Sequence, residues 1–338
     1  MPEAPRDTLG RPIRDLRISV TDKCNFRCGY CMPEEIYGEA YKFLPKAQIL
    51  SYEEVVRIAR AAVGLGVKKL RITGGEPLLR ADLPDLIGML ASIPGVEDLS
   101  LTTNGYLLAG FAPALKAAGL DRVTISLDTI DEEIFKQMSG RKYGPAPVLA
   151  GIQAAADAGL GPIKINAVVQ RGRNDHTLLD LVREFRGTGH IVRFIEFMDV
   201  GNLNGWNLES VVPAKDIVKI IGDEWPLEPV DPNYAGEVAQ RYRFADGQGE
   251  VGMITSVTQP FCTGCTRARL SPEGKLVTCL FASDGHDLRK VLRDGASDDE
   301  LRQALSDIWI ARTDRYSETR SANTDPGPRK IEMYHLGG

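Results

Sequence analysis

The sequence lacks the features of secreted, membrane-spanning and polyanion-binding proteins. It has no run of about 18 apolar residues, as a transmembrane helix requires, and Met1–Arg17 carries charges and prolines where a signal peptide needs an apolar segment. Its formal net charge of −5 gives no overall basic surface for nucleic acid. We therefore expect a cytoplasmic chain that binds neither membranes nor nucleic acid. Any binding of a small anion must depend on a local cluster of Arg and Lys.

The sequence also has no isolated cysteine. Its six cysteines form two groups of three, which are Cys24, Cys28 and Cys31 near the start and Cys262, Cys265 and Cys279 toward the end. An odd number in each group makes closed internal disulfides awkward, and a reducing cytosol favours metal or cluster ligation. We interpret both groups as ligand sets.

Internal repeats and low-complexity tracts are absent, and 338 residues with 43% hydrophobic and 26% charged composition indicate a globular protein of one or two domains. Six apolar, β-rich segments alternate with segments that can form helices, which predicts an α/β fold with a parallel sheet and helices outside it. The six are Leu16–Val20, Lys69–Thr73, Leu99–Thr103, Arg122–Leu127, Ile163–Val169 and Ile191–Met198.

Local signals place the helices between these strands. Ser51 and Glu54 form a capping box ahead of an apolar helix that stops at Gly64 and Gly66. Asp131 opens a second helix with acidic residues in its first turn, and Ala146–Ala158 supplies a third.

The composition changes near Trp225, after which prolines and glycines separate short strands. We therefore expect one region at 1–225 and a smaller one at 226–338. The short strands are Arg241–Phe244, Val251–Thr255, and the hairpin of Arg267–Leu270 with Lys275–Leu280, which places Cys265 and Cys279 on neighbouring strands.

The first cysteine group has the spacing C-x3-C-x2-C and directly follows the first predicted strand. A structural zinc site closes with four ligands, whereas three thiolates on an iron–sulfur cubane leave one iron open. With Tyr30 just before the last cysteine, the motif resembles the signature of the radical S-adenosylmethionine (SAM) superfamily. The resemblance implies that Cys24, Cys28 and Cys31 hold a [4Fe-4S] cluster whose open iron binds SAM, and that Tyr30 contacts the SAM adenine.

A Gly-Gly-Glu-Pro turn at 74–77 follows the second predicted strand. Two glycines allow the backbone to approach a ligand closely at the strand's carboxyl end, although the turn could equally be an ordinary connection. It resembles the element with which radical SAM enzymes bind the SAM amino group, which implies a contact from Gly75. Ser126 and Met198 end later strands, at positions where further SAM contacts are expected. Each of them could equally serve ordinary packing of the barrel.

The second group has the spacing C-x2-C-x13-C, and His286 could complete a Cys3His zinc site. Over essentially its full length the chain nevertheless resembles the MoaA-type GTP 3′,8-cyclase family. The shared features are the N-terminal cysteine trio, the Gly-Gly-Glu-Pro turn, the C-terminal trio followed by Arg267-Ala268-Arg269, and the terminal Gly337-Gly338. The resemblance implies an incomplete (β/α)6 TIM-type barrel with its active site at the carboxyl ends of the strands, closed by a smaller C-terminal α+β region. It further implies a second [4Fe-4S] cluster on Cys262, Cys265 and Cys279 that binds GTP.

Several basic residues interrupt otherwise apolar strands, where a charge needs a partner. A triphosphate pocket requires such residues, although pairing with a buried carboxylate such as Glu196 is the alternative. With the family resemblance, the expected GTP-binding residues are Arg17, Lys69, Arg71, Thr102, Lys164, Arg193, Arg267, Ala268 and Arg269. The same resemblance implies that Arg17, Arg267 and Arg269 are catalytic and that Gly337 and Gly338 reach into the active site, with a frayed tail as the alternative.

The resemblance implies a lyase-type enzyme that uses a 5′-deoxyadenosyl radical to convert GTP into 3′,8-cyclo-7,8-dihydro-GTP, the first step of molybdenum cofactor (molybdopterin) biosynthesis. It also implies an external one-electron donor and cyclic pyranopterin monophosphate synthase as the next enzyme. The oligomeric state is left open, with a homodimer as one candidate. Two alternatives remain, another radical SAM enzyme with an auxiliary cluster that acts on a peptide or other small molecule, and a zinc-stabilised binding module.

Overall fold

A computed structural model describes residues 4–234, 236–320 and 329–337 of the chain. Its strands are β1 (Asp15–Ser19), β2 (Lys69–Thr73), β3 (Asp98–Thr103), β4 (Arg122–Ser126), β5 (Lys164–Val169), β6 (Ile191–Glu196), β7 (Leu227–Val230), β8 (Gln240–Phe244), β9 (Glu250–Ile254), β10 (Arg267–Leu270), β11 (Lys275–Val277) and β12 (His286–Asp287). The helices are α1 (Glu34–Tyr37), α2 (Tyr52–Gly64), α3 (Leu83–Ala91), α4 (Leu108–Ala117), α5 (Glu132–Ser139), α6 (Ala146–Asp157), α7 (Leu178–Phe185), α8 (Ala214–Glu224), α9 (Leu288–Arg293), α10 (Asp298–Ile310), α11 (Tyr316–Thr319) and α12 (Met333–Leu336). Short 3-10 turns include η5 (Cys262–Gly264).

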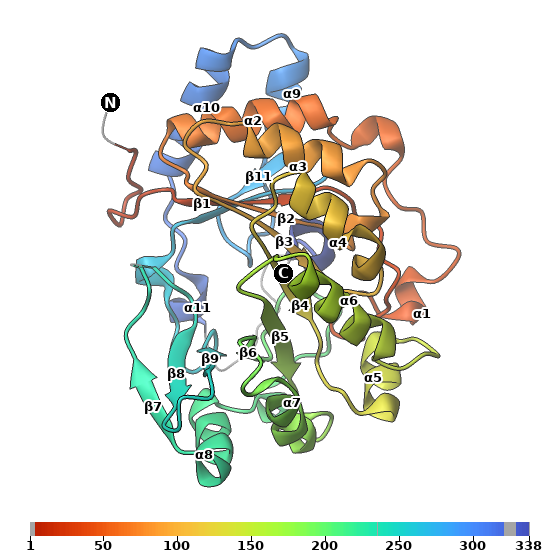
Figure 1. Cartoon of the computed structure of the whole chain (residues 1–338). Helices are drawn as coiled ribbons and strands as arrows, with labels where there is room; N and C mark the ends of the chain where they lie inside the picture. The colour runs from red at the N-terminus through yellow and green to blue at the C-terminus, as the bar shows by residue number, and fades with distance from the viewer. Residues whose placement is uncertain (1–3, 235, 321–328, 338) are drawn as a thin grey trace.

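All twelve strands belong to one sheet, in the order β12-β11-β10-β1-β2-β3-β4-β5-β6-β9-β8-β7. The six predicted parallel strands are confirmed as β1 to β6, with bounds shifted by at most a few residues. Figure 1 shows helices α2 to α7 along the outer side of the curved sheet, as alternation of strands and helices requires.

The core of six parallel strands is as expected, and the C-terminal region closes the barrel by adding strands at both edges of that core. The C-terminal region adds β10 beside β1 and β9 beside β6, both parallel to their neighbours. The β8–β9 pair is antiparallel, so the chain reverses before β9 and enters the sheet in the direction of β6. The parallel part of the sheet therefore has eight strands, and the C-terminal residues extend it at both ends.

Strand periodicity separates a hydrophobic outer layer from a polar interior. In β1, Leu16 and Ile18 are fully buried under the helices, whereas Asp15 and Arg17 alternate with them and face the interior cavity. The same alternation in β2 directs Lys69 toward the cavity. The interior of this barrel is therefore lined by side chains that can bind a polar ligand.

The predicted helix signals are confirmed. The Ser51 hydroxyl accepts the Glu54 N–H and the Glu54 carboxylate accepts the Ser51 N–H, which is a complete capping box on α2. Asp131 caps α5 by accepting the N–H of Ile134. Helix α10 packs on the outside of α2, where Arg57 pairs with Asp298.

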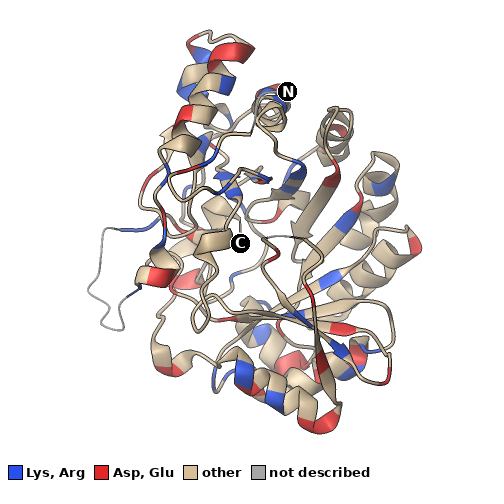
Figure 2. Ribbon diagram, turned by 90° about the vertical axis from the view of Figure 1, so that its left-hand side faces the viewer, with Lys and Arg blue, Asp and Glu red and all other residues tan. Residues whose placement is uncertain are grey.

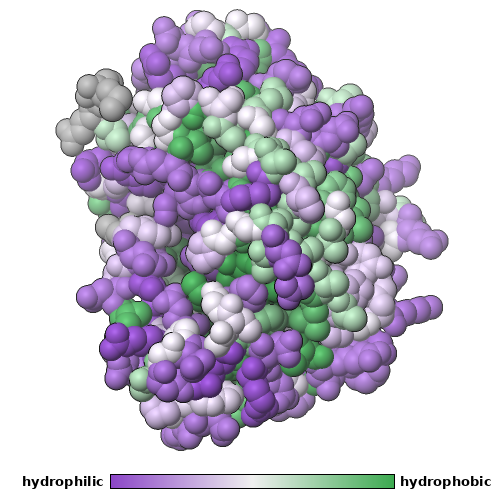
Figure 3. Space-filling model, viewed as in Figure 1, coloured by the Kyte–Doolittle hydropathy of each residue, from purple (hydrophilic) through white to green (hydrophobic). Residues whose placement is uncertain are grey.

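Charged residues of both signs cover the outer helices, and further Lys and Arg lie on the interior strands (Figure 2). The face in Figure 3 is hydrophilic around its rim, with hydrophobic residues gathered toward its middle. Within the described ranges no helix has the length and hydropathy needed to cross a bilayer.

Candidate active site

A cavity of about 310 Å³ runs along the inside of the sheet. It extends from Asp15, Lys69 and Arg122 at the amino ends of the strands to Ser126 and Met198 at or beyond their carboxyl ends. All six cysteines line it. One partly open cavity therefore connects the two cysteine groups.

The two groups lie toward opposite ends of this cavity, which corrects the expectation of a single site at the carboxyl ends. Cys24, Cys28 and Cys31 are in the loop after β1. Cys262 and Cys265 instead precede β10, which runs parallel to β1 with Asp15 opposite Arg267. Cys265 and Cys279 also lie just outside the hairpin strands that were expected to carry them. The hairpin thus directs the second trio to the amino end of the barrel.

The first trio is held in a tight loop. The N–H groups of Cys31 and Met32 both donate to the carbonyl of Cys28, at 2.9 and 2.8 Å. The Arg27 guanidinium binds the carbonyl of Cys24 at 2.7 Å. The N–H of Phe26 donates to the Cys24 sulfur at 3.4 Å, and the Asn104 amide lies 3.8 Å from the same sulfur. The loop is therefore ordered by its own hydrogen bonds.

The environment of these thiols suits a bound cation. Burial, with a smaller contribution from Glu76, raises the pKa of Cys24 to about 11. Burial also raises the pKa values of Cys28 and Cys31 well above the usual range for a thiol. Thiolates are stable in such a place only when positive charge accompanies them, which the irons of a cluster provide. The donor set therefore fits a cluster.

The Gly-Gly turn serves packing between loops. A Cβ on Gly75 would lie 2.2 Å from the carbonyl oxygen of Lys23, and one on Gly74 would lie 2.8 Å from that of Thr21. The N–H of Gly75 donates to Thr21 and the N–H of Glu76 to Lys23, both at 2.7 Å. The glycines are thus required by close contact with the segment that leads into the first trio.

The buried Glu76 fixes the far side of this turn. Its carboxylate accepts the Thr103 hydroxyl and the Asn104 N–H, each at 2.7 Å, and the Leu78 N–H at 3.0 Å. Burial raises the pKa of Glu76 to about 7. The turn, β3 and the cysteine loop are therefore connected through one carboxyl group.

The residues expected to bind SAM all line the cavity beside the first trio. Ser126 ends β4, whereas Met198 lies two residues beyond β6. The Tyr30 hydroxyl donates to Asp128 at 2.7 Å, and the other oxygen of Asp128 accepts the Val168 N–H at 2.8 Å. Burial raises the pKa of Asp128 to about 6. Asp128 was not expected from the sequence, although its position directly after a strand is a usable signal.

The second trio lies among cations. The Cys265 sulfur accepts hydrogen bonds from Arg267 and Arg312, each at 3.3 Å. Burial alone would raise the pKa of Cys265, but the two guanidinium groups lower it to about 6. Burial raises the pKa of Cys279. A thiolate at position 265 is therefore favoured, as ligation of iron requires.

The zinc alternative depends on His286, which the hairpin places elsewhere. His286 is exposed on β12 opposite Leu276 and does not belong to the cavity lining, unlike the three cysteines. Across the described residues no three His, Cys, Asp or Glu side chains converge as ligands of a single ion. Thiolates on a cubane bind different irons, so their sulfurs need not converge on one point.

Basic residues fill the space between the two trios. Burial lowers the pKa of Arg17 well below its usual range, and Arg269, Arg71 and Arg267 lower it further because they are positive neighbours. Burial, followed by like-charge repulsion, lowers the pKa values of Arg71 and Arg269 to about 10 and that of Arg193 to about 9. Positive charge in the cavity is therefore incompletely balanced, which favours binding of a multivalent anion.

Not every expected GTP residue lines the cavity. Arg17, Lys69, Arg71, Thr102, Arg193, Arg267 and Arg269 do. Ala268 is fully buried in the hydrophobic core, because it alternates with its two arginine neighbours. Lys164 lies outside the lining. Burial lowers its pKa, and the positive charges of Arg193 and Arg122 lower it further. Glu196 accepts the N–H groups of Ala214, Val257 and Thr258, so it satisfies loops near the cavity.

The C-terminal tail approaches the same cavity. Tyr334 lines it and shares a hydrogen bond of 2.9 Å with the hydroxyl of Tyr41. Gly337 is buried with a φ of +66°, and a Cβ there would lie 2.0 Å from the Thr73 side chain at the end of β2. Gly338 lies outside the described residues.

The sequence reasoning did not single out several other lining residues. Asn166 accepts a hydrogen bond of 2.9 Å from Arg193, and Arg122 forms a bidentate pair with Asp98. A polar residue at a cavity-facing strand position is the signal that could have found them. Tyr234 covers the Lys69 ammonium, whose nitrogen is 3.2 Å from the ring centroid. Neither Tyr234 nor Arg312 has such a signal, because both come from irregular segments.

Two family models match the chain, that of the radical SAM superfamily over residues 18–185 and that of Molybdenum Cofactor Synthesis C over residues 190–318. A GTP 3′,8-cyclase from Acidothermus cellulolyticus is 52% identical over 357 residues, covering 98% of this chain and 99% of the relative. One from Xanthomonas campestris is 54% identical over 333 residues, with 98% and 97% coverage, and one from Staphylococcus carnosus is 50% identical over 335 residues, with 98% of each covered.

The crystal structure of Streptococcus suis SuiB bound to S-adenosylmethionine matches this fold with a TM-score of 0.60 at 16% sequence identity, covering 93% of this chain and 69% of that chain. This match supports the partial barrel core. The sequence relatives are far closer and span the whole chain. The chain therefore belongs to the GTP 3′,8-cyclase family of the radical SAM superfamily.

Proposed function

We propose that this chain is a radical SAM GTP 3′,8-cyclase that converts GTP into 3′,8-cyclo-7,8-dihydro-GTP, the first step of molybdenum cofactor biosynthesis. The observation that carries the proposal is one cavity lined by both cysteine trios and by buried cations, with the trios at opposite ends of the parallel strands β1 and β10. Two reactive centres at opposite ends of the cavity, with positive charge between them, suit a nucleoside triphosphate. The names of the relatives supply the identity of that nucleotide.

The cofactor assignments extend this proposal. Membership of the radical SAM superfamily implies that the chain uses SAM and an iron–sulfur cluster. We infer that Cys24, Cys28 and Cys31 hold this cluster and that the cavity-lining residues Tyr30, Gly75, Ser126 and Met198 bind SAM. Cys262, Cys265 and Cys279 would hold a second [4Fe-4S] cluster. SAM and a cluster held by Cys24, Cys28 and Cys31 would supply radical chemistry directed at C3′ of the GTP ribose.

The chain's own residues bind and orient the substrate. The guanidinium groups of Arg17, Arg71 and Arg193 are buried around the cavity, and Arg71 repels each of the other two, so a triphosphate between them would relieve that repulsion. Arg267 and Arg269 extend this charge toward the second trio, and each has an Nε–H without a partner among the described residues. These donors are available to the nucleotide.

The walls of the cavity would protect and orient a radical intermediate. A carbon radical requires exclusion of competing hydrogen donors and fixed distances between reacting atoms. The parallel strands supply the walls, and Tyr334 of the tail helix α12 and Tyr234 add aromatic rings to the lining. We infer that these segments help to hold GTP in one orientation while ring closure occurs.

The remaining assignments follow from the family resemblance and the chemistry of the product. An external donor would supply the electron, and cyclic pyranopterin monophosphate synthase would receive the labile product. We place the enzyme in the cytoplasm, with a homodimer as one candidate assembly. We also propose that residues 1–225 and 226–338 are two regions of the chain that contribute strands to one sheet.

The test is anaerobic incubation of reconstituted protein with SAM, reductant and GTP, followed by mass analysis. We expect 5′-deoxyadenosine and an isomer of GTP, with neither formed when ATP replaces GTP. Arg71→Ala should reduce GTP affinity roughly 10- to 100-fold, because a charged hydrogen bond contributes about 1.5–3 kcal/mol. Arg302→Ala, an exposed substitution on α10, is the matched control.

Formation of 5′-deoxyadenosine at equal rates with and without GTP would contradict the proposal. That result would favour the alternative of another radical SAM enzyme with an auxiliary cluster. A peptide substrate would not need the buried cations between the trios. This alternative therefore also predicts that Arg71→Ala leaves the formation of 5′-deoxyadenosine unchanged.

A further inference from the structure

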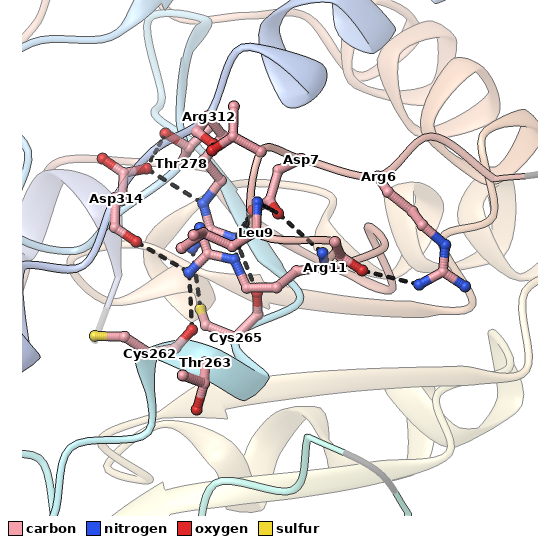
Figure 4. Close-up of polar contacts among 12 residues, drawn as sticks. Arg6, Asp7, Leu9, Arg11, Cys262, Thr263, Cys265, Thr278, Arg312 and Asp314 are labelled. Atoms are coloured by element: carbon pink, nitrogen blue, oxygen red, sulfur yellow. Dashed lines mark hydrogen bonds and ion pairs between the residues drawn. The ribbon is translucent and has the colours of Figure 1, made fainter.

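Arg312 contacts the second cysteine trio from a distant part of the sequence. It follows α10 and donates to the Cys265 carbonyl at 2.8 Å through Nη1 and to the Cys265 sulfur at 3.3 Å through Nη2. Figure 4 shows this side chain directed at Cys265 within a network of polar contacts. One guanidinium group therefore fixes both the main chain and the side chain of a predicted cluster ligand.

The rest of the Arg312 side chain is fully engaged by the protein. Its Nε donates to Asp314 at 3.2 Å, Nη1 lies 3.4 Å from Asp7, and the guanidinium stacks on Trp309 with its carbon 4.6 Å from the ring centroid. The side chain is only 2% exposed. Arg267 differs, because its Nε has no partner within the described ranges. Arg312 is therefore suited to hold the protein in place, whereas Arg267 can also bind substrate.

The carboxylates that bind Arg312 connect it to the other two cysteine segments. Asp7 also accepts Arg11 Nε at 2.6 Å, and Arg11 Nη1 donates to the Cys262 carbonyl at 2.8 Å. Asp314 accepts the hydroxyl of Thr278, the residue before Cys279, at 2.6 Å. A brace made of the buried residues Asp7, Arg11 and Arg312 and the partly exposed Asp314 thus contacts all three segments that carry the second trio (Figure 4).

We propose that Arg312 is a positioning residue for the second cluster, holding Cys265 in its ligating orientation and tuning the cluster through a charged hydrogen bond to sulfur. The inference rests on the proposed function, because it takes the second trio as the ligands of a cluster. A cationic donor to a ligand sulfur stabilises the more negative, reduced cluster and so raises its reduction potential. Loss of this donor should lower the potential and loosen the cluster.

The experiment compares wild type with Arg312→Gln, Arg312→Lys and Arg302→Gln, all reconstituted anaerobically. Arg312→Lys keeps a positive charge beside Asp7 and Asp314, which protects the fold. It cannot make both contacts to Cys265, so it still removes the interaction under test. We measure iron per chain, the rate at which a ferrous chelator removes iron, and the reduction potentials of the clusters by electron paramagnetic resonance. For both Arg312 variants we expect half of the iron to leave roughly 10- to 100-fold faster than in wild type. We also expect a more negative potential for the second cluster alone.

The first cluster is an internal control in every sample, because a general folding defect would alter both clusters. Unchanged iron release and an unchanged second potential in Arg312→Lys and Arg312→Gln would overturn the inference. A fall in GTP affinity with an unaltered second cluster would also overturn it, since Arg312 would then be a substrate contact. Wild-type protein with only about four irons would instead refute the proposed second cluster itself.

Discussion

At the scale of single residues, the main feature of the site is charge that the protein does not neutralise by itself. Arg17 lies near Arg269, Arg71 and Arg267, and each lowers its pKa. The carboxylates within reach, such as Asp15 and Asp98, are fewer than the cations and partly engaged, since Asp98 pairs with Arg122. A bound triphosphate would complete this charge balance, which explains why so many buried cations are tolerated.

We predict that Lys164, which lies outside the cavity lining, acts on GTP through its charge and makes the binding of GTP sensitive to pH. Burial, followed by repulsion from Arg193, lowers the pKa of Lys164 to about 7 in the free protein. A bound triphosphate favours the ammonium and raises this pKa, so the complex holds more protons than the free protein above pH 7. The dissociation constant for GTP should therefore rise by up to about tenfold per pH unit above 7.

Titration calorimetry between pH 7 and 9 measures this dependence. Lys164→Met, run in parallel, should bind GTP more weakly at pH 7 and lose most of the dependence. Equal pH profiles for the two proteins would show that Lys164 does not sense the nucleotide.

At the scale of elements, the cysteine loop and the turn after β2 depend on each other. The carbonyl of Lys23 lies so close to Gly75 that no side chain fits between them. Glu76 then connects the turn to β3 through Thr103 and Asn104. The first trio is thus positioned by three consecutive parallel strands, and changes in the turn should affect the cluster.

Gly75→Ala should disrupt the first cluster selectively. Its Cβ would displace the Lys23 backbone, so we expect iron per chain to fall from about eight to about four after reconstitution. Gly110→Ala is the matched control, because a Cβ at this helical position meets no atom within 4 Å. It should retain all iron and gain up to about 1 kcal/mol in stability. Equal iron contents in the two variants would show that the turn can relax.

At the scale of the whole molecule, the C-terminal region completes the barrel. Strands β9 and β10 extend the parallel sheet at both ends, and the residues around Cys262 and Cys279 line the cavity that β1 to β6 begin. The N-terminal Asp7 and Arg11 brace the second trio from outside the barrel. Folding of the first region and formation of the second site are therefore linked.

GTP should stabilise the whole fold because it neutralises repulsion at the centre of the sheet. At a concentration of about 100 times the dissociation constant, the free energy of unfolding should increase by about 2.7 kcal/mol. Thermal denaturation of anaerobic holoenzyme measures this gain. Inorganic triphosphate should reproduce part of it, whereas guanosine should give less. Stabilisation by guanosine equal to that by GTP would contradict the role of the cations.

The sequence by itself determined the six parallel strands β1 to β6, the helix caps and the grouping of the cysteines into two trios. These features are local, because strand periodicity, a capping box such as Ser51 with Glu54, and the spacing of Cys24, Cys28 and Cys31 are each contained in short segments. Cavity-facing cations such as Arg71 and Arg193 were predictable for the same reason, since a charge in an apolar strand indicates an interior polar site.

Only the tertiary structure decided where the second trio lies and what supports it. The direction of β10 is set by pairing with β1, more than 200 residues away in sequence, and this pairing places Cys265 at the amino end of the barrel. The brace of Asp7, Arg11, Arg312 and Asp314 likewise joins two pairs of residues that lie about 300 positions apart in the sequence. Such contacts form because buried charges must find partners when distant segments pack together, and no short stretch of sequence records that requirement.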